Sequence, residues 1–421
     1  MRHFFPDLPQ WLQRVKDPRD PESLHYSLRH LFWCVESMFL LHLKSRNQFR
    51  WERHGVAFAE NLRTLASSDE DTVAHPDTAA VVLERLEPDQ SATLLAEFTR
   101  RLIRMKALDE SRVRGHLLLA VDGSGHLSFD YPHCPHCIRT QHASGTVSYR
   151  HPVLVAFLVG ASGMAVATAV EFVENPAEGF NKQDCETKAF ARMSQRLKDL
   201  FPQTPFCLLL DALYASAQVM DICELNQWKY CITFKESDMP ALWKEAIALR
   251  LMSPRQDHTL RHTHPSQSDH NRTLRLRWVN DLDHQGHRCS ALWQDETVGK
   301  LTTHFAHLTN WDLHAQNVEF SACASRQRWR IENEGFNVLK NGGFDLEHAY
   351  SRNFNAAKNY FHLMLIAHLL QQLMVRGSLF AHFARQLGTW RNFARRLAEA
   401  LRLTPIPHDT AIPAQIRFCT D

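Results

Sequence analysis

Two short apolar segments that each end in an aspartate constrain the fold more than any other feature of this chain. Residues 117–122 read LLLAVD and residues 206–211 read FCLLLD. Apolar runs this short, without polar alternation, are typical of strands that are buried on both faces of a sheet. Because such strands point their carboxyl ends at one edge of an open sheet, Asp122 and Asp211 converge if the strands are neighbours. Each acid also fits a plain turn or helix cap.

The segments around these two strands predict a mixed α/β core. The other predicted elements are strands at 151–159, 164–173 and 229–234 and helices at 184–200 and 215–227. The resulting order βββαβαβ, with an acid at the end of two strands, indicates a ribonuclease H-like sheet. At the start of the first helix, we expect Asp184 to be the N-cap or a first-turn acid and Glu186 to favour the helix dipole. The lesser alternative for these acids is to support the ligands of a metal site.

A third acid lies in residues 326–340, RQRWRIENEGFNVLK, which we expect to form one helix of about four turns. The residues that a helical wheel places on one arc are Trp329, Glu332, Phe336 and Leu339. Because this arc is apolar, we expect Trp329 to pack the helix onto the sheet and Glu332 to need a partner for its charge. Arg328, Lys340 or a metal ion can be that partner.

The three acids together predict a magnesium site. Converging carboxylates suit Mg²⁺, which prefers oxygen ligands and keeps several of its waters. Two such ions about 3.5–4 Å apart activate an attacking hydroxyl group and stabilise the leaving oxygen of a phosphodiester. Asp122, Asp211 and Glu332 are therefore the candidate catalytic and metal-binding residues.

The sequence around these acids resembles the DDE transposases of bacterial insertion sequences. Arg328-Trp-Arg-Ile-Glu332 and the later Lys340 are similar to the Arg-Trp-x-Ile-Glu motif and the lysine of one group. That group has a Tyr-Arg-Glu-Lys signature and a β-insertion before its catalytic glutamate. Val121-Asp-Gly123 and Leu210-Asp-Ala-Leu-Tyr214 are similar to the segments of its first and second aspartates. The resemblance extends over residues 115–375.

Two positions depart from the pattern of that group. Ser325 stands where the signature tyrosine is expected, and Lys340 lies one residue further from Glu332 than usual. The position of the lysine therefore leaves Glu334 as an alternative third acid. The Arg-Trp-x-Ile-Glu motif and the apolar arc favour Glu332.

The resemblance implies a transposase that cleaves double-stranded DNA at the ends of an insertion sequence and transfers the freed strand into target DNA. It implies two Mg²⁺ or Mn²⁺ ions as cofactors and a homodimer on DNA. The basic residues expected to contact DNA phosphates are Arg326, Arg328, Arg330 and Lys340. Two alternatives are a ribonuclease H-like nuclease without strand transfer and a non-catalytic, DNA-binding relic of a transposase.

Residues 126–150, between the first two strands, form an insert that contains cysteines and histidines. Cys134 and Cys137 have the C-x₂-C spacing of a zinc knuckle, and tetrahedral zinc needs two more ligands. We assign these to His136 and His142, with His133 and His151 as the alternatives. A plain loop and a redox-active cysteine pair are the other interpretations of this insert.

The chain is long enough for several segments around one sizeable core, because it has 421 residues, of which 44% are hydrophobic and 22% charged. The expected segments are a helical, DNA-binding N-terminal region at 1–112, the first part of the core at 113–235, a β-rich insertion at 236–310, the catalytic-helix part of the core at 311–350 and a helical C-terminal region at 351–421. Within the insertion we expect a polar, His-rich loop at 253–271.

No apolar run reaches the length that a membrane-spanning helix needs. The closest, at 360–374, is interrupted by histidines and glutamines, and the N-terminus lacks the apolar core of a signal peptide. We therefore expect a cytoplasmic protein that has no membrane partner. The resemblance to transposases of insertion sequences implies that this protein is bacterial.

Overall fold

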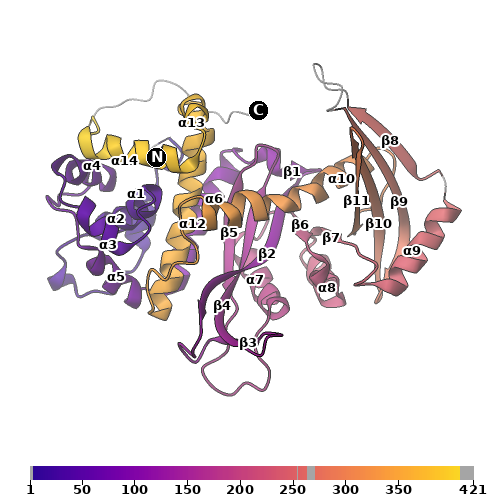
Figure 1. Cartoon of the computed structure of the whole chain (residues 1–421), viewed down its shortest axis with the longest axis horizontal. Helices are drawn as coiled ribbons and strands as arrows, with labels where there is room; N and C mark the ends of the chain where they lie inside the picture. The colour runs from indigo at the N-terminus through magenta and orange to yellow at the C-terminus, as the bar shows by residue number, and fades with distance from the viewer. Residues whose placement is uncertain (1–2, 254, 263–270, 408–421) are drawn as a thin grey trace.

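One mixed sheet runs through the molecule, with a helical region beside one end of it (Figure 1). The structure is a computed structural model that describes residues 3–253, 255–262 and 271–407. Among these residues the sheet has eleven strands in the order β3-β4-β2-β6-β7-β11-β10-β9-β8, with β5 beside β4 and β1 beside β2. The strands are β1 (Arg112–Val113), β2 (His116–Phe129), β3 (Ile138–Gln141), β4 (Val147–Val159), β5 (Ala165–Phe172), β6 (Phe206–Leu210), β7 (Lys229–Thr233), β8 (Asp257–His262), β9 (Arg272–His284), β10 (His287–Val298) and β11 (Leu301–Thr309).

Five central strands form the ribonuclease H-like core that the sequence predicts. The strands β5, β4 and β2 pair antiparallel, whereas β2, β6 and β7 pair parallel. The order β5-β4-β2-β6-β7 gives β2 and β6 a neighbour on each side. Their apolar residues are buried accordingly, because residues 117–121 and 206–210 are each at most 2% exposed. The predicted α/β class is therefore confirmed.

The first acid-bearing strand is longer than the sequence predicts. The strand β2 pairs with β6 only as far as Ala120, but it continues past Asp122 and pairs with β4 as far as Phe129. Asp122 therefore lies where β2 loses its parallel neighbour and not at the end of the strand. The second half of β2, β3 and the first half of β4 form a β-ribbon that carries the Cys/His insert and extends beyond the sheet (Figure 1).

The helices α7 (Glu186–Leu200) and α8 (Ala217–Leu225) connect core strands at the predicted places. The N-cap of α7 is Cys185, whose backbone is extended, so the prediction that Asp184 caps or begins this helix is wrong. Asp184 instead accepts the N–H of Glu174 at 3.0 Å and pairs with Arg192 at 2.7 Å. Its carboxylate thus fastens the end of β5 to the middle of α7.

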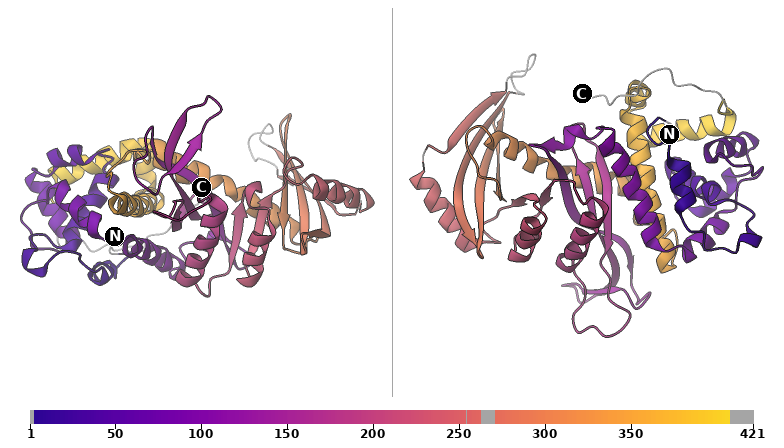
Figure 2. Two further views of the ribbon diagram at one scale, coloured as in Figure 1. Left: turned by 90° about the horizontal axis from the view of Figure 1, so that it is seen from below. Right: turned by 180° about the vertical axis from the view of Figure 1, so that it is seen from behind.

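The strands of the β-rich insertion continue the same sheet. After α9 (Pro240–Met252), the strands β8 to β11 pair antiparallel, and β11 pairs antiparallel with β7. Part of the expected loop at 253–271 is the strand β8, because its residues pair with β9, and residues 263–270 lie outside the described residues. The insertion lies at the opposite end of the molecule from the N-terminal helices (Figure 2).

The helices of the two chain ends pack into one helical region. These helices are α1 (Leu8–Arg14), α2 (Leu28–Leu40), α3 (Arg46–Glu52), α4 (Val56–Ala66), α5 (Pro76–Arg85), α6 (Pro88–Arg104), α12 (Phe354–Arg376), α13 (Ala381–Leu387) and α14 (Trp390–Leu403). The helix α12 packs against α2, α5 and α6, and α14 packs against α4. Asn61 in α4 donates to the carbonyls of Leu401 and Thr404 at 2.8 and 2.9 Å. The described parts of the two predicted helical segments, 3–112 and 351–407, are therefore not spatially separate.

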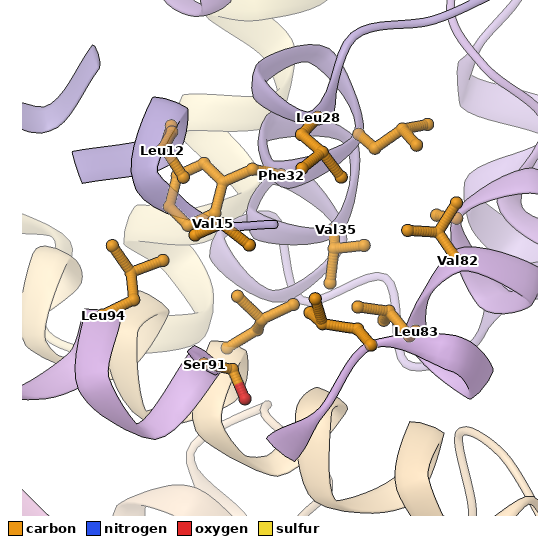
Figure 3. Close-up of a pocket in the computed structure, with 13 residues that line it drawn as sticks. Leu12, Val15, Leu28, Phe32, Val35, Val82, Leu83, Ser91 and Leu94 are labelled. Carbon is orange, nitrogen blue, oxygen red and sulfur yellow. The ribbon is translucent and has the colours of Figure 1, made fainter. Parts of the chain in front are cut away.

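An apolar pocket lies inside this helical region, between α1, α2, α5 and α6 (Figure 3). Its lining includes Leu12, Phe32, Val35, Leu83 and Leu94. These helices are short, and an isolated short helix is marginally stable, so the shared apolar interior stabilises them together.

The helix α12 is buried along most of its length, and its polar side chains bind neighbouring backbone. Asn359 donates to the carbonyls of Leu83 and Leu86, and Gln372 bonds both the N–H and the carbonyl of Ala165 at the start of β5. These bonds join the helical region to the sheet. In the described part of the chain, no helix is long and apolar enough to cross a membrane.

Candidate active site

Strand register places the first two predicted acids next to each other. The strands β2 and β6 run parallel, with Ala120 opposite Leu209. Two residues further along each chain, Asp122 and Asp211 therefore stand at the same level. The strand β6 ends just before Asp211, and the chain then enters a 3₁₀ turn at Ala212–Tyr214, which leaves this edge of the sheet open.

Asp122 is a half-buried carboxylate among other charges. Its Oδ1 accepts the N–H of Gly123 at 2.9 Å, and its Oδ2 lies 3.8 Å from Nη1 of Arg328. The pKa of Asp122 is raised to about 6, mainly by burial, with further contributions from the carboxylates of Glu332 and Glu186. The Gly123 N–H and Arg328 oppose this rise. The surroundings of Asp122 thus favour a bound proton or a bound cation over a bare negative charge.

Asp211 combines the capping role with an accessible carboxylate. Its Oδ1 accepts the N–H of Ala212 at 2.7 Å, and Nζ of Lys235 lies 3.9 Å from the same oxygen. The side chain is 42% exposed. Because both contacts use Oδ1, the capping role of Asp211 does not exclude cation binding by the same carboxylate.

The segment that carries the third acid is not one regular α-helix, so that prediction is wrong. The helix α10 (Val318–Arg326) continues through a 3₁₀ turn at Gln327–Trp329 and a π-helical stretch at Ile331–Phe336 into α11 (Asn337–Asn341). A π-turn closes its hydrogen bonds over five residues, where an α-turn closes them over four. A helical wheel drawn at the α-helical period therefore assigns the wrong faces here.

The π-helical stretch changes which residues face the core. Ile331 and Phe336, five residues apart, are both buried. Gly335 lies so close to Phe157 that a Cβ on this glycine would be 3.4 Å from the ring. Trp329 is 47% exposed, so it does not pack the helix onto the sheet, and this prediction is wrong. Glu332 likewise leaves the buried arc, and its side chain is 38% exposed.

Glu332 is connected to Asp122 through Arg328. The Nη2 of Arg328 donates to Oε1 of Glu332 at 2.8 Å, and its Nη1 lies 3.8 Å from Oδ2 of Asp122. The Arg328 side chain is only 12% exposed, so water screens its charge weakly. The sequence allows Arg328, Lys340 or a metal ion as the partner of the Glu332 charge. In the structure Arg328 is the residue that pairs with it.

Glu334 has different surroundings from Glu332. Its Oε1 accepts from Nη1 of Arg330 at 2.6 Å, and Nη2 of Arg330 donates to the carbonyl of Ala161 at 3.2 Å. Ala161 lies in the turn between β4 and β5. Glu332, and not Glu334, is the carboxylate of this segment that acts on the pKa of Asp122.

A fourth acid, Glu186, joins these residues, although the sequence favours a helix-dipole role for it over support of the metal site. It is the first residue of α7, and its carboxylate lies so close to Gly123 that a Cβ there would overlap with it. The Tyr214 hydroxyl donates to Oε2 of Glu186 at 3.4 Å. Burial raises the pKa of Glu186, and the Asp211 carboxylate adds to the rise. The glycine directly after Asp122 is the one sequence signal for this close approach.

The four acids form a donor set that suits a hard divalent cation. The carboxylates of this acid cluster are those of Asp122, Asp211, Glu186 and Glu332. Burial raises the pKa values of Asp122 and Glu186, repulsion from the neighbouring carboxylates adds to the rise, and a bound cation would offset both effects. Among the described residues, no three acids place their oxygens within 4.8 Å of one another, so waters or substrate oxygens would complete the coordination.

The four predicted DNA-contacting residues lie in different surroundings. Arg328 reaches the acid cluster. The other three residues pair with glutamates that do not belong to this cluster. Their partners are Glu296 for Arg326 at 3.8 Å, Glu334 for Arg330 at 2.6 Å and Glu347 for Lys340 at 3.0 Å. Lys235, which the sequence does not single out, is the cation beside Asp211.

Ser325 does not take the place of the signature tyrosine at the acids. It is 3% exposed, and its hydroxyl donates to the carbonyl of Ala322 within α10 at 2.9 Å. The tyrosine that touches the acid cluster is Tyr214, through Glu186. It comes from the turn after β6 and not from the helix of Glu332.

The two cysteines of the insert lie close together. The histidines beside them are not the two that we assign from the sequence. The sulfurs of Cys134 and Cys137 lie 3.8 Å apart, and Nε2 of His151 lies 3.5 and 3.3 Å from them. His133, Cys134 and His151 place their ligand atoms within 4.8 Å of one another.

The assignment of His136 and His142 as zinc ligands is wrong. The Nδ1 of His136 bonds the carbonyl of Asn175 at 2.8 Å, and its ring stacks on Phe354. The Nε2 of His142 bonds the hydroxyl of Ser148 at 2.8 Å. The β-ribbon directs these two rings away from the cysteines, and residue spacing does not show such directions.

A comparison with protein families agrees with this arrangement. The sequence profile of the transposase DDE domain matches residues 181–370, a range that contains Asp211, Glu332 and the insertion between them. Asp122 precedes the matched range and is joined to it by the pairing of β2 with β6. No curated protein matches the chain. The profile and the fold together identify residues 181–370 of this chain as a transposase DDE domain.

Proposed function

We propose that this protein cleaves double-stranded DNA at the ends of a mobile element and joins the freed 3′ ends to target DNA. The observation that carries the proposal is the meeting of Asp122 and Asp211, on neighbouring parallel strands, with Glu332 from beyond the β-insertion. Three acids from distant parts of the sequence thus gather at one open edge of a sheet. Such a cluster destabilises a fold unless a ligand uses it.

In this proposal Asp122, Asp211 and Glu332 hold divalent ions, Mg²⁺ or Mn²⁺. When bound, two such ions supply an activated hydroxyl nucleophile and stabilise the leaving oxygen of the phosphodiester. Arg328 holds the Glu332 carboxylate beside Asp122 before the ions bind. Its planar guanidinium then remains at the same edge, where it can bind a DNA phosphate with two hydrogen bonds.

Other cations near the acid cluster extend this phosphate-binding surface. Lys235 is 53% exposed and stands beside Asp211, so a phosphate that approaches this edge meets its charge. Arg326, Arg330 and Lys340 are assigned to phosphates further along the segment of Glu332. Each would exchange a carboxylate partner for a DNA phosphate.

The helical region beside the sheet is assigned to DNA binding outside the catalytic edge. In α3, Trp51 is 70% exposed, and the guanidinium of Arg50 lies 5.8 Å from its ring centroid. An exposed aromatic ring next to arginine suits contact with a nucleic acid. A homodimer belongs to the same proposal, because the two ends of an element must be held together for joining.

The function is tested with purified full-length protein and DNA that carries the sequences flanking its own coding region. With Mg²⁺ we expect nicks at the element ends and joined products, and both should disappear with EDTA. Ends that lack a 3′-hydroxyl should not be joined. Cleavage without joining would assign the nuclease alternative, and DNA binding without cleavage in Mg²⁺ or Mn²⁺ would assign the non-catalytic one.

Glu186 is expected to support the metal site and not to be its main ligand. Glu186→Gln removes one carboxylate from the acid cluster, so we expect weaker Mg²⁺ activation by about 10- to 100-fold, the range for residues that support metal ligands. Saturating Mg²⁺ should restore most of the cleavage rate. The measurement is a Mg²⁺ titration of DNA cleavage.

The matched control for this titration is Glu178→Gln, because Glu178 is an exposed acid ahead of α7. This variant should follow the wild-type titration curve. An unchanged curve for Glu186→Gln would remove Glu186 from the metal site.

A further inference from the structure

We propose that Cys134, Cys137, His133 and His151 bind a zinc ion, which ties together the β-ribbon of the insert, whose strand β2 also carries Asp122. This site lies apart from the acid cluster and uses thiolate and imidazole ligands in place of carboxylates. Soft sulfur and nitrogen donors select zinc over the magnesium that suits the acids. The proposal does not depend on DNA cleavage.

The distances in this group agree with tetrahedral zinc. Zinc at about 2.3 Å from sulfur and about 2.1 Å from nitrogen separates two sulfurs by about 3.8 Å and a sulfur from a nitrogen by about 3.6 Å. Here the two sulfurs lie 3.8 Å apart, and the sulfur-to-nitrogen distances to His151 are 3.5 and 3.3 Å. A disulfide would require the sulfurs at about 2.05 Å.

His133 supplies the fourth ligand. Its Nδ1 is buried and has no hydrogen-bond partner among the described residues. A ligand atom of this ring lies within 4.8 Å of those of Cys134 and His151, so a small rotation brings it to zinc. The ring stacks on Phe129 with centroids 4.3 Å apart, which holds it on the side of the cysteines. A buried nitrogen without a partner is costly unless a ligand binds it.

The four ligands come from two places along the ribbon. His133, Cys134 and Cys137 lie in the loop between β2 and β3, and His151 lies in β4 opposite Leu127. A zinc ion would therefore fasten the loop to the pair β2–β4, whose β2 strand carries Asp122. Of the loop residues 130–137, only Cys137 is buried. A metal ion would therefore stabilise a loop that contributes little to the apolar core.

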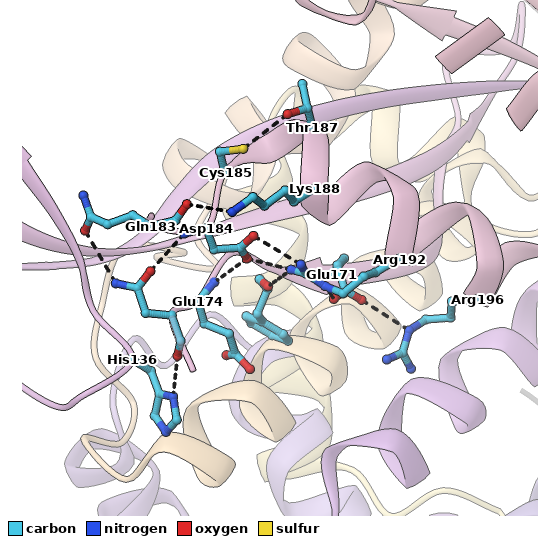
Figure 4. A network of polar contacts seen from close by, with 12 residues as sticks. His136, Glu171, Glu174, Gln183, Asp184, Cys185, Thr187, Lys188, Arg192 and Arg196 are labelled. Atoms are coloured by element: carbon cyan, nitrogen blue, oxygen red, sulfur yellow. Dashed lines mark hydrogen bonds and ion pairs between the residues drawn. The ribbon is translucent and has the colours of Figure 1, made fainter. Parts of the chain in front are cut away.

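A polar network leads from His136, the residue before Cys137, to Asp184 just ahead of α7 (Figure 4). The buried Asn175 donates to the carbonyl of Cys137 at 2.8 Å, and its N–H donates to the carbonyl of His136 at 3.1 Å. Its Oδ1 accepts the N–H of Asp184 at 2.9 Å. Asp184 stands two residues before Glu186, so zinc would also position the start of α7 and with it the Glu186 carboxylate.

The test is the metal content of the full-length protein, measured by mass spectrometry after washing with a weak chelator. We expect about one zinc per chain, and the Co²⁺-substituted protein should show the thiolate charge-transfer and strong d–d bands of tetrahedral coordination. Cys134→Ser/Cys137→Ser should lose the metal. His133→Asn and His151→Asn should each weaken its binding.

Matched controls are His136→Asn and His142→Asn, because these histidines lie in the same insert but bond other groups. Both should keep the zinc. A wild-type protein without zinc and without the tetrahedral Co²⁺ spectrum would overturn the proposal. So would zinc retained by the double cysteine variant, or a Cys134–Cys137 disulfide in freshly purified protein. If the cysteine variant does not fold, the histidine variants and the Co²⁺ spectrum decide.

Discussion

Replacing Glu332 by glutamine is expected to slow metal-dependent DNA cleavage by at least about 100-fold, a loss typical for one group that stabilises charge in a transition state. The glutamine side chain keeps the hydrogen bond to Arg328 but brings no negative charge to the metal ions. Glu334→Gln is expected to keep the cleavage rate within about tenfold of wild type, because Glu334 pairs with Arg330 away from Asp122. The measurement is the initial rate of nicking at the element ends.

The two variants control for each other, because they make the same chemical change two residues apart. Both carboxylates accept a hydrogen bond from the arginine four residues earlier. Melting curves should show that both variants fold. Full activity of Glu332→Gln, or an equal loss in the two variants, would exclude Glu332 as the third acid.

Asp122→Asn is expected to stabilise the metal-free protein while it abolishes cleavage. The pKa of the Asp122 carboxyl is raised from 3.8 to about 6, so the folded state binds its proton more tightly than the unfolded state. Stability from this proton is present below about pH 4 and is lost as pH rises to about 6. Above that range the ionised Asp122 destabilises the fold, and asparagine removes the charge.

The expected gain at pH 7.5 is about 1–2 kcal/mol after allowance for solvent screening of a partly exposed group. The side-chain carbonyl of the new asparagine can still accept the Gly123 N–H, so the local backbone keeps its bond. The measurement is the free energy of unfolding without metal at pH 5 and pH 7.5. The free energy of unfolding of Asp122→Asn, relative to that of wild type, should increase from pH 5 to pH 7.5.

Addition of Mg²⁺ provides the counterpart of this experiment. It should stabilise the wild type, because a bound cation replaces the proton at Asp122, and it should stabilise Asp122→Asn much less. If Asp122→Asn is less stable than wild type at pH 7.5 without metal, the ionised Asp122 carboxylate does not destabilise the fold. Equal stabilisation of both proteins by Mg²⁺ would place the metal elsewhere.

The central sheet could be read from the sequence because its strands are uniformly apolar. Residues 117–121 and 206–210 are buried on both faces, and this burial is what the unbroken apolar runs indicate. The continuation of β2 beyond Asp122 could not be predicted in the same way. Beyond Asp122 it pairs mainly with β4, so its sequence, GSGHLSF, carries no long apolar run.

The segment of Glu332 shows why periodicity failed for one helix. An α-helical wheel puts Trp329 and Glu332 on the buried face with Phe336, but in the π-helical stretch Ile331 and Gly335 are buried beside Phe336, and Trp329 is 47% exposed. The π-helical stretch packs against Phe157 of β4, which contacts Gly335 and the ring of Phe336. A helical wheel contains no such contact between distant segments, so it could not assign the buried face here.

Sequence alone determined the residue types that can do chemistry and the strands that carry two of them. Asp122, Asp211 and the C-x₂-C pair are visible because an acid after an apolar run and a cysteine spacing are local patterns. Only the tertiary structure decided which other residues join them: Glu186 beside Gly123, Arg328 between Glu332 and Asp122, and His133 and His151 beside the cysteines. Convergence in space depends on strand register, helix phase and ring direction, and each of these is set by packing between segments far apart in the chain.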